Sequence, residues 1–259
     1  MDLQWLGINA FRLTQGGTTV LLDPYVSRQT TPLCKPELVR RCFPAAAGVV
    51  ISHSHWDHLA DAHVVAAHTG AVVFGSRTTV NVCRSFGIPD GQLVELGDGD
   101  VAERGGISVR FLRSAHMPLP DGTVAYPGCY EAPPCRPPQA APEYLEGGTF
   151  AVLLELGGCR VLDIGSANLV EDGIRGLEVD VLLLSAAGWQ RTPQYLERVF
   201  SCVSARVVVP CHHDDFLQPL TEGIRVRDPA GLAELVRRVP ELAPGTQVRS
   251  LDLLETISV

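Results

Sequence analysis

Short apolar runs bounded by glycine-rich turns alternate with amphipathic stretches along the chain. Runs of about four to eight residues rich in Val, Leu and Ile are typical of strands, and longer stretches with helical periodicity are typical of helices. In the first half the expected strands are 3–7, 10–14, 18–23, 49–52, 71–74 and 107–112. The expected helices of this half are 57–68, which Gly70 ends, and 78–86.

The second half repeats this plan. A hairpin turns at Gly157-Gly158, the expected strands are 179–185, 206–209 and 247–257, and the expected helices are 193–203 and 229–239. Strands that alternate with helices, in a chain with 46% apolar residues, predict one α/β domain over residues 1–259.

The segment 117–148 breaks the pattern, because it holds eight of the 19 prolines and has neither a helical nor a strand period. Loops of this length within a compact domain are usually functional or disordered. We expect an inserted loop that caps a substrate pocket and contributes Tyr126, Tyr130 or Tyr144, with Trp56 and Trp189 in the same pocket. A dimer interface or a mobile flap is the alternative.

Candidate chemistry is concentrated in residues 53–58, which contain His53, His55, Asp57 and His58 directly after an apolar run. Imidazole and carboxylate are ligands of zinc, iron and manganese, and residues two apart in extended chain point to one side. None of the eight cysteines forms a Cys-x-x-Cys pair, so a structural zinc site is disfavoured. The pattern favours a catalytic metal site over a histidine-rich surface loop.

This run matches in full the His-x-His-x-Asp-His signature of the metallo-β-lactamase-fold hydrolases, and the chain resembles that family over nearly its whole length. The opening, residues 5–11 and 21–25, is similar to the branch that contains ascorbate-6-phosphate lactonase. The resemblance implies a four-layer αββα sandwich. Through matches at 114–116 and 210–212, it also implies a full set of metal ligands: His53, His55, Asp57, His58, His116 and His212.

One departure from the family concerns the carboxylate that bridges two metals there. The expected Gly-Asp is replaced by Gly165-Ser166, and Asp163 lies on the opposite side of a regular strand from Ser166. Three interpretations stay open. The chain holds one metal at His53, His55 and His116, or two metals bridged by water only, or a second site repaired by His213, Asp214 or Asp215.

The resemblance implies a metal-dependent hydrolase that acts on a small ester, lactone, thioester or amide through a hydroxide formed on one or two zinc ions. Manganese or iron could replace zinc. In this hypothesis Asp57 orients the water or accepts its proton, and His213 faces the substrate. The alternatives are a non-hydrolytic enzyme for cyclisation or elimination with a single Lewis-acid metal, or an iron-dependent oxygenase.

Charge narrows the range of partners. The formal net charge of -8, from 29 acidic and 21 basic residues, argues against nucleic acid, so we expect a small-molecule substrate. Arg113, Arg136 and Arg191 could hold one carboxylate or phosphate of it. The sequence shows neither a long apolar span nor a signal segment, which predicts no membrane association and a cytoplasmic location; a homo-oligomer is left open.

Overall fold

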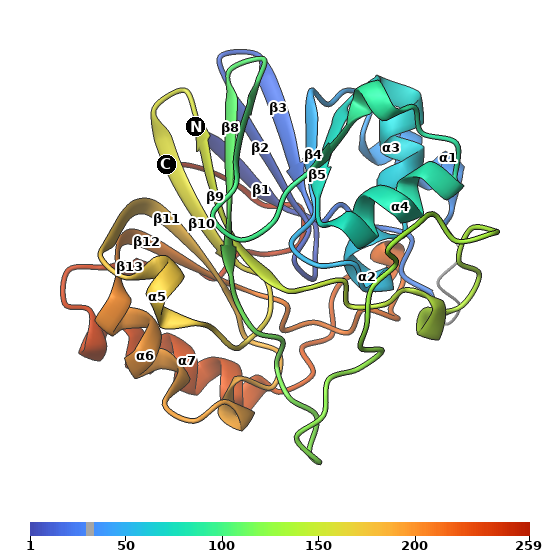
Figure 1. Cartoon of the computed structure of the whole chain (residues 1–259). Helices are drawn as coiled ribbons and strands as arrows, with labels where there is room; N and C mark the ends of the chain where they lie inside the picture. Colours follow the sequence, from blue (N-terminus) through green and yellow to red (C-terminus); the bar gives the residue numbers. More distant parts are fainter. Residues whose placement is uncertain (30–33) are drawn as a thin grey trace.

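The structure, a computed structural model, describes residues 1–29 and 34–259 (Figure 1). Its elements in chain order are β1 (Asp2–Trp5), β2 (Phe11–Gln15), β3 (Thr18–Leu22), α1 (Pro36–Cys42), β4 (Gly48–Val50), α2 (Trp56–Leu59), α3 (Ala62–Thr69), β5 (Val72–Gly75), α4 (Arg77–Ser85), η1 (Asp90–Gln92), β6 (Leu93–Glu95), β7 (Val101–Arg104), β8 (Ile107–Arg113), η2 (Ala141–Glu143), β9 (Phe150–Leu156), β10 (Cys159–Ile164), α5 (Glu171–Ile174), β11 (Leu177–Ser185), η3 (Trp189–Arg191), α6 (Tyr195–Cys202), β12 (Val203–Cys211), η4 (Leu220–Glu222), α7 (Pro229–Leu242), β13 (Gln247–Val248) and β14 (Thr256–Ser258).

Two seven-stranded sheets pack face to face in the middle of the molecule. The first has the order β14-β1-β2-β3-β4-β5-β6, and the second has the order β13-β12-β11-β10-β9-β8-β7. Helices α1, α3 and α4 cover the outer face of the first sheet, and α5, α6 and α7 cover the second (Figure 1). The four-layer αββα arrangement expected from the resemblance is therefore confirmed.

Strand β11 shows why the central strands read as unbroken apolar runs. Val181 and Leu183 pack in the layer between the two sheets, whereas Leu182 and Leu184 pack against the helices outside. Because successive side chains point to opposite faces and both faces are covered, all positions from 181 to 184 are apolar.

The strand directions bring several loops to one edge of the sandwich. Strands β3, β4 and β5 run parallel in the first sheet, and β10, β11 and β12 run parallel in the second. Parallel strands end at the same edge of a sheet, so the segments that follow β4, β10 and β12 can meet there. Such strand-end loops on a rigid scaffold are common positions for binding and catalytic residues.

The expected helix 57–68 is wrong in one respect, because the structure divides it into α2 and α3. The division lies at Asp61, whose buried carboxylate accepts hydrogen bonds from the backbone N–H groups of Val26 and Ser27, both at 2.8 Å. The Ser27 hydroxyl also donates to it at 2.6 Å. This long-range pairing of a buried carboxylate is a tertiary effect that helical periodicity does not report.

The expected closing strand 247–257 is also wrong. The chain instead places β13 at the edge of the second sheet and β14 at the edge of the first. Between them Leu251 packs in the layer between the sheets, and Leu254 has a positive φ of 66°. A backbone that turns in this way cannot continue as one strand.

Candidate metal centre

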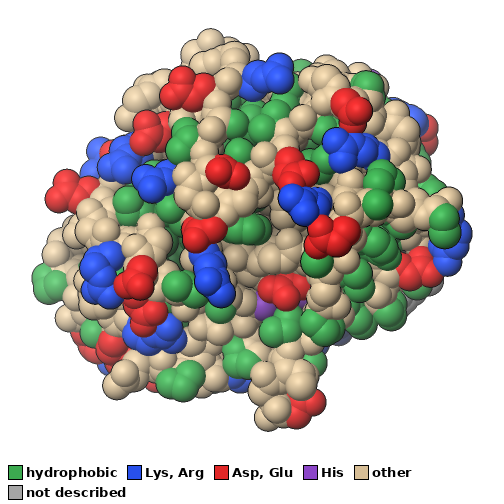
Figure 2. Space-filling model, in the orientation of Figure 1, with side chains coloured by type: hydrophobic (Ala, Val, Ile, Leu, Met, Phe, Trp, Pro, Cys, Tyr) green, Lys and Arg blue, Asp and Glu red, His purple; other side chains and the backbone are tan. Residues whose placement is uncertain are grey.

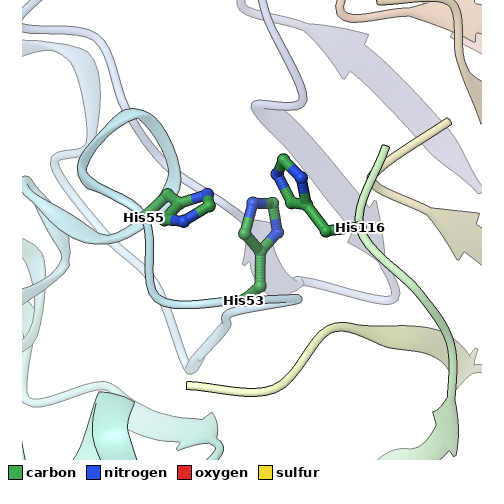
Figure 3. Close-up of side chains that lie close together, drawn as sticks. All are labelled: His53, His55 and His116. Carbon is green, nitrogen blue, oxygen red and sulfur yellow. The ribbon is translucent and has the colours of Figure 1, made fainter. Parts of the chain in front are cut away.

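Three histidines from two loops converge on one point (Figure 3). His53 and His55 follow β4, and His116 follows β8. One ring nitrogen from each lies within 4.8 Å of the others, and the ring centroids are 4.7 to 5.1 Å apart. We call these three residues the first group.

Two of these rings have their tautomer fixed by backbone carbonyls. His55 Nε2 lies 2.8 Å from the carbonyl oxygen of Ala125, and His116 Nδ1 lies 2.8 Å from that of Met117. A carbonyl oxygen only accepts, so each of these nitrogens carries the hydrogen and the other ring nitrogen carries the lone pair. Metal-bound histidines are commonly held in this manner.

The third ring is fixed through a short relay. The Ser52 hydroxyl donates to Asp23 Oδ2 at 2.6 Å, so its oxygen is free to accept from His53 Nδ1 at 3.2 Å. That leaves the lone pair on His53 Nε2, a buried atom without a hydrogen-bond partner among the described residues. A buried polar atom without a partner is costly, and a metal at this point would satisfy it.

A second group consists of Asp57, His58 and His212, whose candidate ligand atoms also lie within 4.8 Å of one another. Asp57 Oδ2 is 3.4 Å from His212 Nε2 and 3.8 Å from His58 Nε2. The ring of His58 lies 3.9 Å from that of His53, so the two groups are neighbours. Both sets that the signature implied are thus brought together by the fold.

The two groups have opposite electrostatics. Burial lowers the pKa of His53 and His55, and it lowers the pKa of His116 to about 4. For His58, burial also opposes the charge, but Asp23 and Asp57 outweigh burial and raise the pKa to about 8. The first group is therefore neutral at pH 7 without a metal, which is the protonation state that a ligand needs.

Asp57 is ionised in the same conditions. Burial acts to raise the pKa of its carboxyl, but His58 and His212 favour the carboxylate more strongly and hold the pKa well below its usual range. At neutral pH the second group therefore contains a carboxylate, Asp57, beside His58, whose raised pKa keeps it largely protonated there.

Asp23 is a residue that the sequence did not single out. Besides the Ser52 hydroxyl, its Oδ2 accepts from His58 Nδ1 at 2.6 Å and from Asn9 Nδ2 at 2.8 Å. It thus orients His58 directly and His53 through Ser52. The sequence signal was an acidic residue directly after the apolar strand β3, and the structure buries Asp23 fully, where a charge needs partners.

The bridging carboxylate that the resemblance implied has no counterpart among the described residues. Ser166 belongs to neither group, and its hydroxyl oxygen accepts from the backbone N–H of Met117 at 2.9 Å. Asp163 is buried behind the site, where Asn9 donates to it at 3.0 Å, and burial together with Asp23 raises its pKa well above the usual value. No described carboxylate belongs to both groups.

The cluster after His212 has other partners. Asp214 forms a buried ion pair with Arg28 at 2.5 Å, and Asp215 pairs with Arg225. His213 packs its ring 4.8 Å from that of Trp5 and lines the pocket described below. The geometry therefore does not support the interpretation in which these residues repair a second site, and a catalytic role of His213 stays a prediction.

The two groups form the floor of a cavity of about 680 Å³. In the space-filling view a histidine is just visible behind an acidic side chain, at lower centre, with hydrophobic side chains beside it (Figure 2). The described residues that line the cavity include Trp56, Met117, Leu119, Ala125, Tyr126, Ser166, Ser185, Arg191, His213, Phe216, Arg227 and Leu232. The segment 117–148 thus borders the pocket through its first part.

Several expected pocket contacts are wrong. Tyr144 is buried in the core beneath the first sheet's helices, and the Tyr130 hydroxyl donates to the carbonyl of Glu143. The indole of Trp189 donates to the carbonyl of Gly231 and packs among the outer helices of the second sheet. Aromatic residues of a long loop or turn can serve its packing as well as a pocket, and sequence does not separate the two uses.

The arginines that line the pocket differ in part from those expected to hold the substrate. Arg191 lines the pocket, but Arg136 pairs with Glu143 on the surface and, like Arg113, is absent from the described lining residues. Arg227 lines the pocket and was not expected, because it lies far along the chain from the histidine motif.

A family model for the beta-lactamase superfamily domain matches residues 2–212. The chain belongs to this family. A relative from Pyrobaculum arsenaticum named as a metal-dependent hydrolase is 27% identical over 140 residues, which are 49% of this chain and 61% of that protein. The match therefore spans less than two thirds of the relative's own length.

Solved structures share the fold. Igni18, a metallo hydrolase from Ignicoccus hospitalis, is 20% identical with a TM-score of 0.60, and the match covers 99% of this chain and 97% of that chain. CmlA, a diiron β-hydroxylase from Streptomyces venezuelae, is 16% identical with a TM-score of 0.63, and the match covers 100% of this chain and 54% of that chain. Since these two names describe different reactions, the fold does not choose the chemistry.

Proposed function

We propose that this protein is a metal-dependent hydrolase that acts on a small ester, lactone, thioester or amide. One observation carries the proposal. His53, His55 and His116 direct three lone pairs at one point on the floor of an open pocket, and the lone pair of His53 Nε2 is buried without a partner among the described residues.

The donor set fits a catalytic metal. Three neutral imidazoles are a known zinc ligand set that leaves a fourth position open to water or substrate, so zinc is the metal that we propose first. When bound there, a divalent metal would acidify a water molecule and polarise the scissile carbonyl. The carbonyls of Ala125 and Met117 hold the rings in the tautomer that this requires.

Asp57 orients the attacking water in this proposal. Its carboxylate stays ionised because His58 and His212 lower its pKa, and such a carboxylate accepts a hydrogen bond well but is a weak proton acceptor at neutral pH. With His58 and His212 it would also hold a second ion.

We further propose that the substrate is a small molecule. The cavity of about 680 Å³ has the size of ordinary ligand pockets, and the net charge of -8 disfavours a nucleic acid. Among the residues described here, no helix is long and apolar enough to cross a membrane.

Elemental analysis of protein purified without added metal, combined with hydrolysis rates, tests the function. The panel is a 4-nitrophenyl ester, a γ-lactone, a thioester and an anilide, each measured with the metal-loaded and the chelated protein. We expect at least one zinc per chain and one substrate whose hydrolysis depends on it. Retained metal without metal-dependent hydrolysis of any of the four would contradict the proposal.

Ser166→Asp tests the number of metals. The new carboxylate would stand where relatives of this fold are expected to carry the bridge, so we expect about tenfold tighter binding of a second ion and a stoichiometry closer to two. Ser166→Asn has the same size without the charge and is the control. Equal stoichiometry in both variants would show that the missing bridge does not limit the second site.

A further inference from the structure

We propose that the substrate carries an anionic group, a carboxylate or a phosphate, that Arg191 and Arg227 bind at the rim of the pocket. The proposal rests on the function proposed above and adds a substrate class to it. The group would lie away from the reacting bond, which sits over the histidines.

The acidic side chains that line the pocket have partners within the protein, whereas two of its arginines do not form ion pairs. Three carboxylates line it, and all three are engaged: Asp57 with His58 and His212, Asp214 with Arg28, and Asp228 with Gln190 and the start of α7. Arg191 and Arg227 line the same pocket, and neither forms an ion pair among the described residues. Arg225 and, more weakly, Arg227 lower the pKa of Asp215. In a chain with net charge -8, two unpaired guanidinium groups at one pocket point to an anionic ligand.

The rim that carries these arginines is cross-linked by hydrogen bonds. Gln190 Nε2 donates to Asp228 Oδ2 at 3.1 Å, and the backbone N–H of Gly231 donates to Asp228 Oδ1 at 2.9 Å. Gln190 precedes Arg191 and Asp228 follows Arg227, so this contact ties together the two segments that carry the arginines. A rim held in this way limits the entropy lost when both arginines engage one group.

The contacts that the two guanidinium groups make leave donors available. Arg191 Nη1 lies 3.5 Å from the thioether sulfur of Met117, which is a weak acceptor. The guanidinium carbon of Arg227 lies 4.8 Å from the centre of the Phe216 ring, a cation–π contact that takes up no N–H donor. Each group therefore keeps N–H donors in the planar arrangement that suits a carboxylate or a phosphate.

The pocket is also lined by the apolar side chains of Met117, Leu119, Phe216 and Leu232. The substrate that we propose therefore has a reactive acyl group, an apolar part and an anionic group.

Calorimetric binding to the metal-loaded protein tests the arginines without turnover. The probes are 3-phenylpropanoate, benzylphosphonate and the neutral 3-phenylpropanamide, and the variant is Arg191→Gln/Arg227→Gln. We expect at least one anion to bind the wild type more tightly than the amide and to lose about tenfold in affinity in the double variant. The amide should change less than about twofold by the same reasoning.

Arg136→Gln is the matched control, because Arg136 is an exposed arginine paired with Glu143 away from the pocket. If the double variant loses affinity for the propanoate alone, the anionic group is a carboxylate. If it loses affinity for the phosphonate alone, the group is a phosphate. The proposal is wrong if neither anion binds the wild type better than the amide, if the double variant binds both as well as the wild type, or if all three probes weaken equally. Failure of ester and amide hydrolysis with this pattern intact would reject the proposed reaction and leave the anion site standing.

Discussion

Each of the two groups of candidate ligands takes two residues from the same six-residue motif, but the groups differ in their surroundings. His53, His55 and His116 form a neutral set, and two of their rings are held by backbone carbonyls. Asp57, His58 and His212 form a charged set, in which the carboxylate of Asp23 holds His58. His53 and His58, whose ring centroids lie 3.9 Å apart, thus have pKa values displaced in opposite directions.

In the function proposed above, this difference means that the two groups would hold metal in different ways. A neutral imidazole set leaves the ion its full positive charge for polarising a substrate, whereas a carboxylate partly neutralises it. Because no described carboxylate belongs to both groups, we expect each to fill with its own affinity. The variants below test that independence.

The largest difference in metal content and hydrolysis rate is expected between His116→Ala and His212→Ala. Loss of one of three ligands should remove the metal from the first group and lower hydrolysis about a thousandfold, since the metal supplies several kcal/mol of transition-state stabilisation. His212→Ala should remove only metal in the second group and lower the rate less. Metal content and rates are measured on the same preparations, and loss of both ions in either variant would show that the groups are coupled.

A smaller effect is expected from Asp23→Asn. Removal of the charge behind His58 should weaken metal binding in the second group about 10- to 100-fold and in the first group less, because Asp23 reaches His53 only through Ser52. Asp163→Asn is the control: burial and Asp23 raise the pKa of that carboxyl and so favour its neutral form, which the amide resembles. Competition with a chromophoric chelator gives both affinities, and equal losses in the two variants would contradict the role of Asp23.

The smallest effect on the site is expected from His63→Phe, which leaves both groups intact. His63 stacks on Phe86 with ring centroids 3.7 Å apart, and burial lowers its pKa to about 4. His63 therefore becomes protonated near pH 6.5 in the unfolded chain but only near pH 4 in the folded chain. The stability that comes from a neutral His63 is complete above pH 6.5 and declines as the pH falls toward 4.

Denaturant unfolding at pH 7.5 and pH 4.5 measures this effect. We expect the loss of unfolding free energy between the two pH values to be smaller in His63→Phe by about 2 kcal/mol. His68→Phe, an exposed position on the same helix, is the control. A pH dependence that His63→Phe leaves unchanged would show that a neutral His63 is not the source of the acid sensitivity.

The sequence alone determined much of this protein. The spacing of His53, His55, Asp57 and His58 after a buried strand marked the candidate metal site, and unbroken apolar runs such as 181–184 of β11 marked strands covered on both faces. Those features are local, because ligand spacing and side-chain alternation are set by a few consecutive residues. The four-layer order came from the resemblance that the same motif carries.

Only the tertiary structure decided which distant residues complete the site. It brought Asp23 behind His58, Ala125 against His55 and Arg227 to the pocket rim, and it buried Tyr144 in the core. The broken helix at Asp61 has the same origin. Each of these outcomes depends on a contact between segments far apart in the chain, and the energy of such a contact comes from burial and a specific partner that no local pattern encodes.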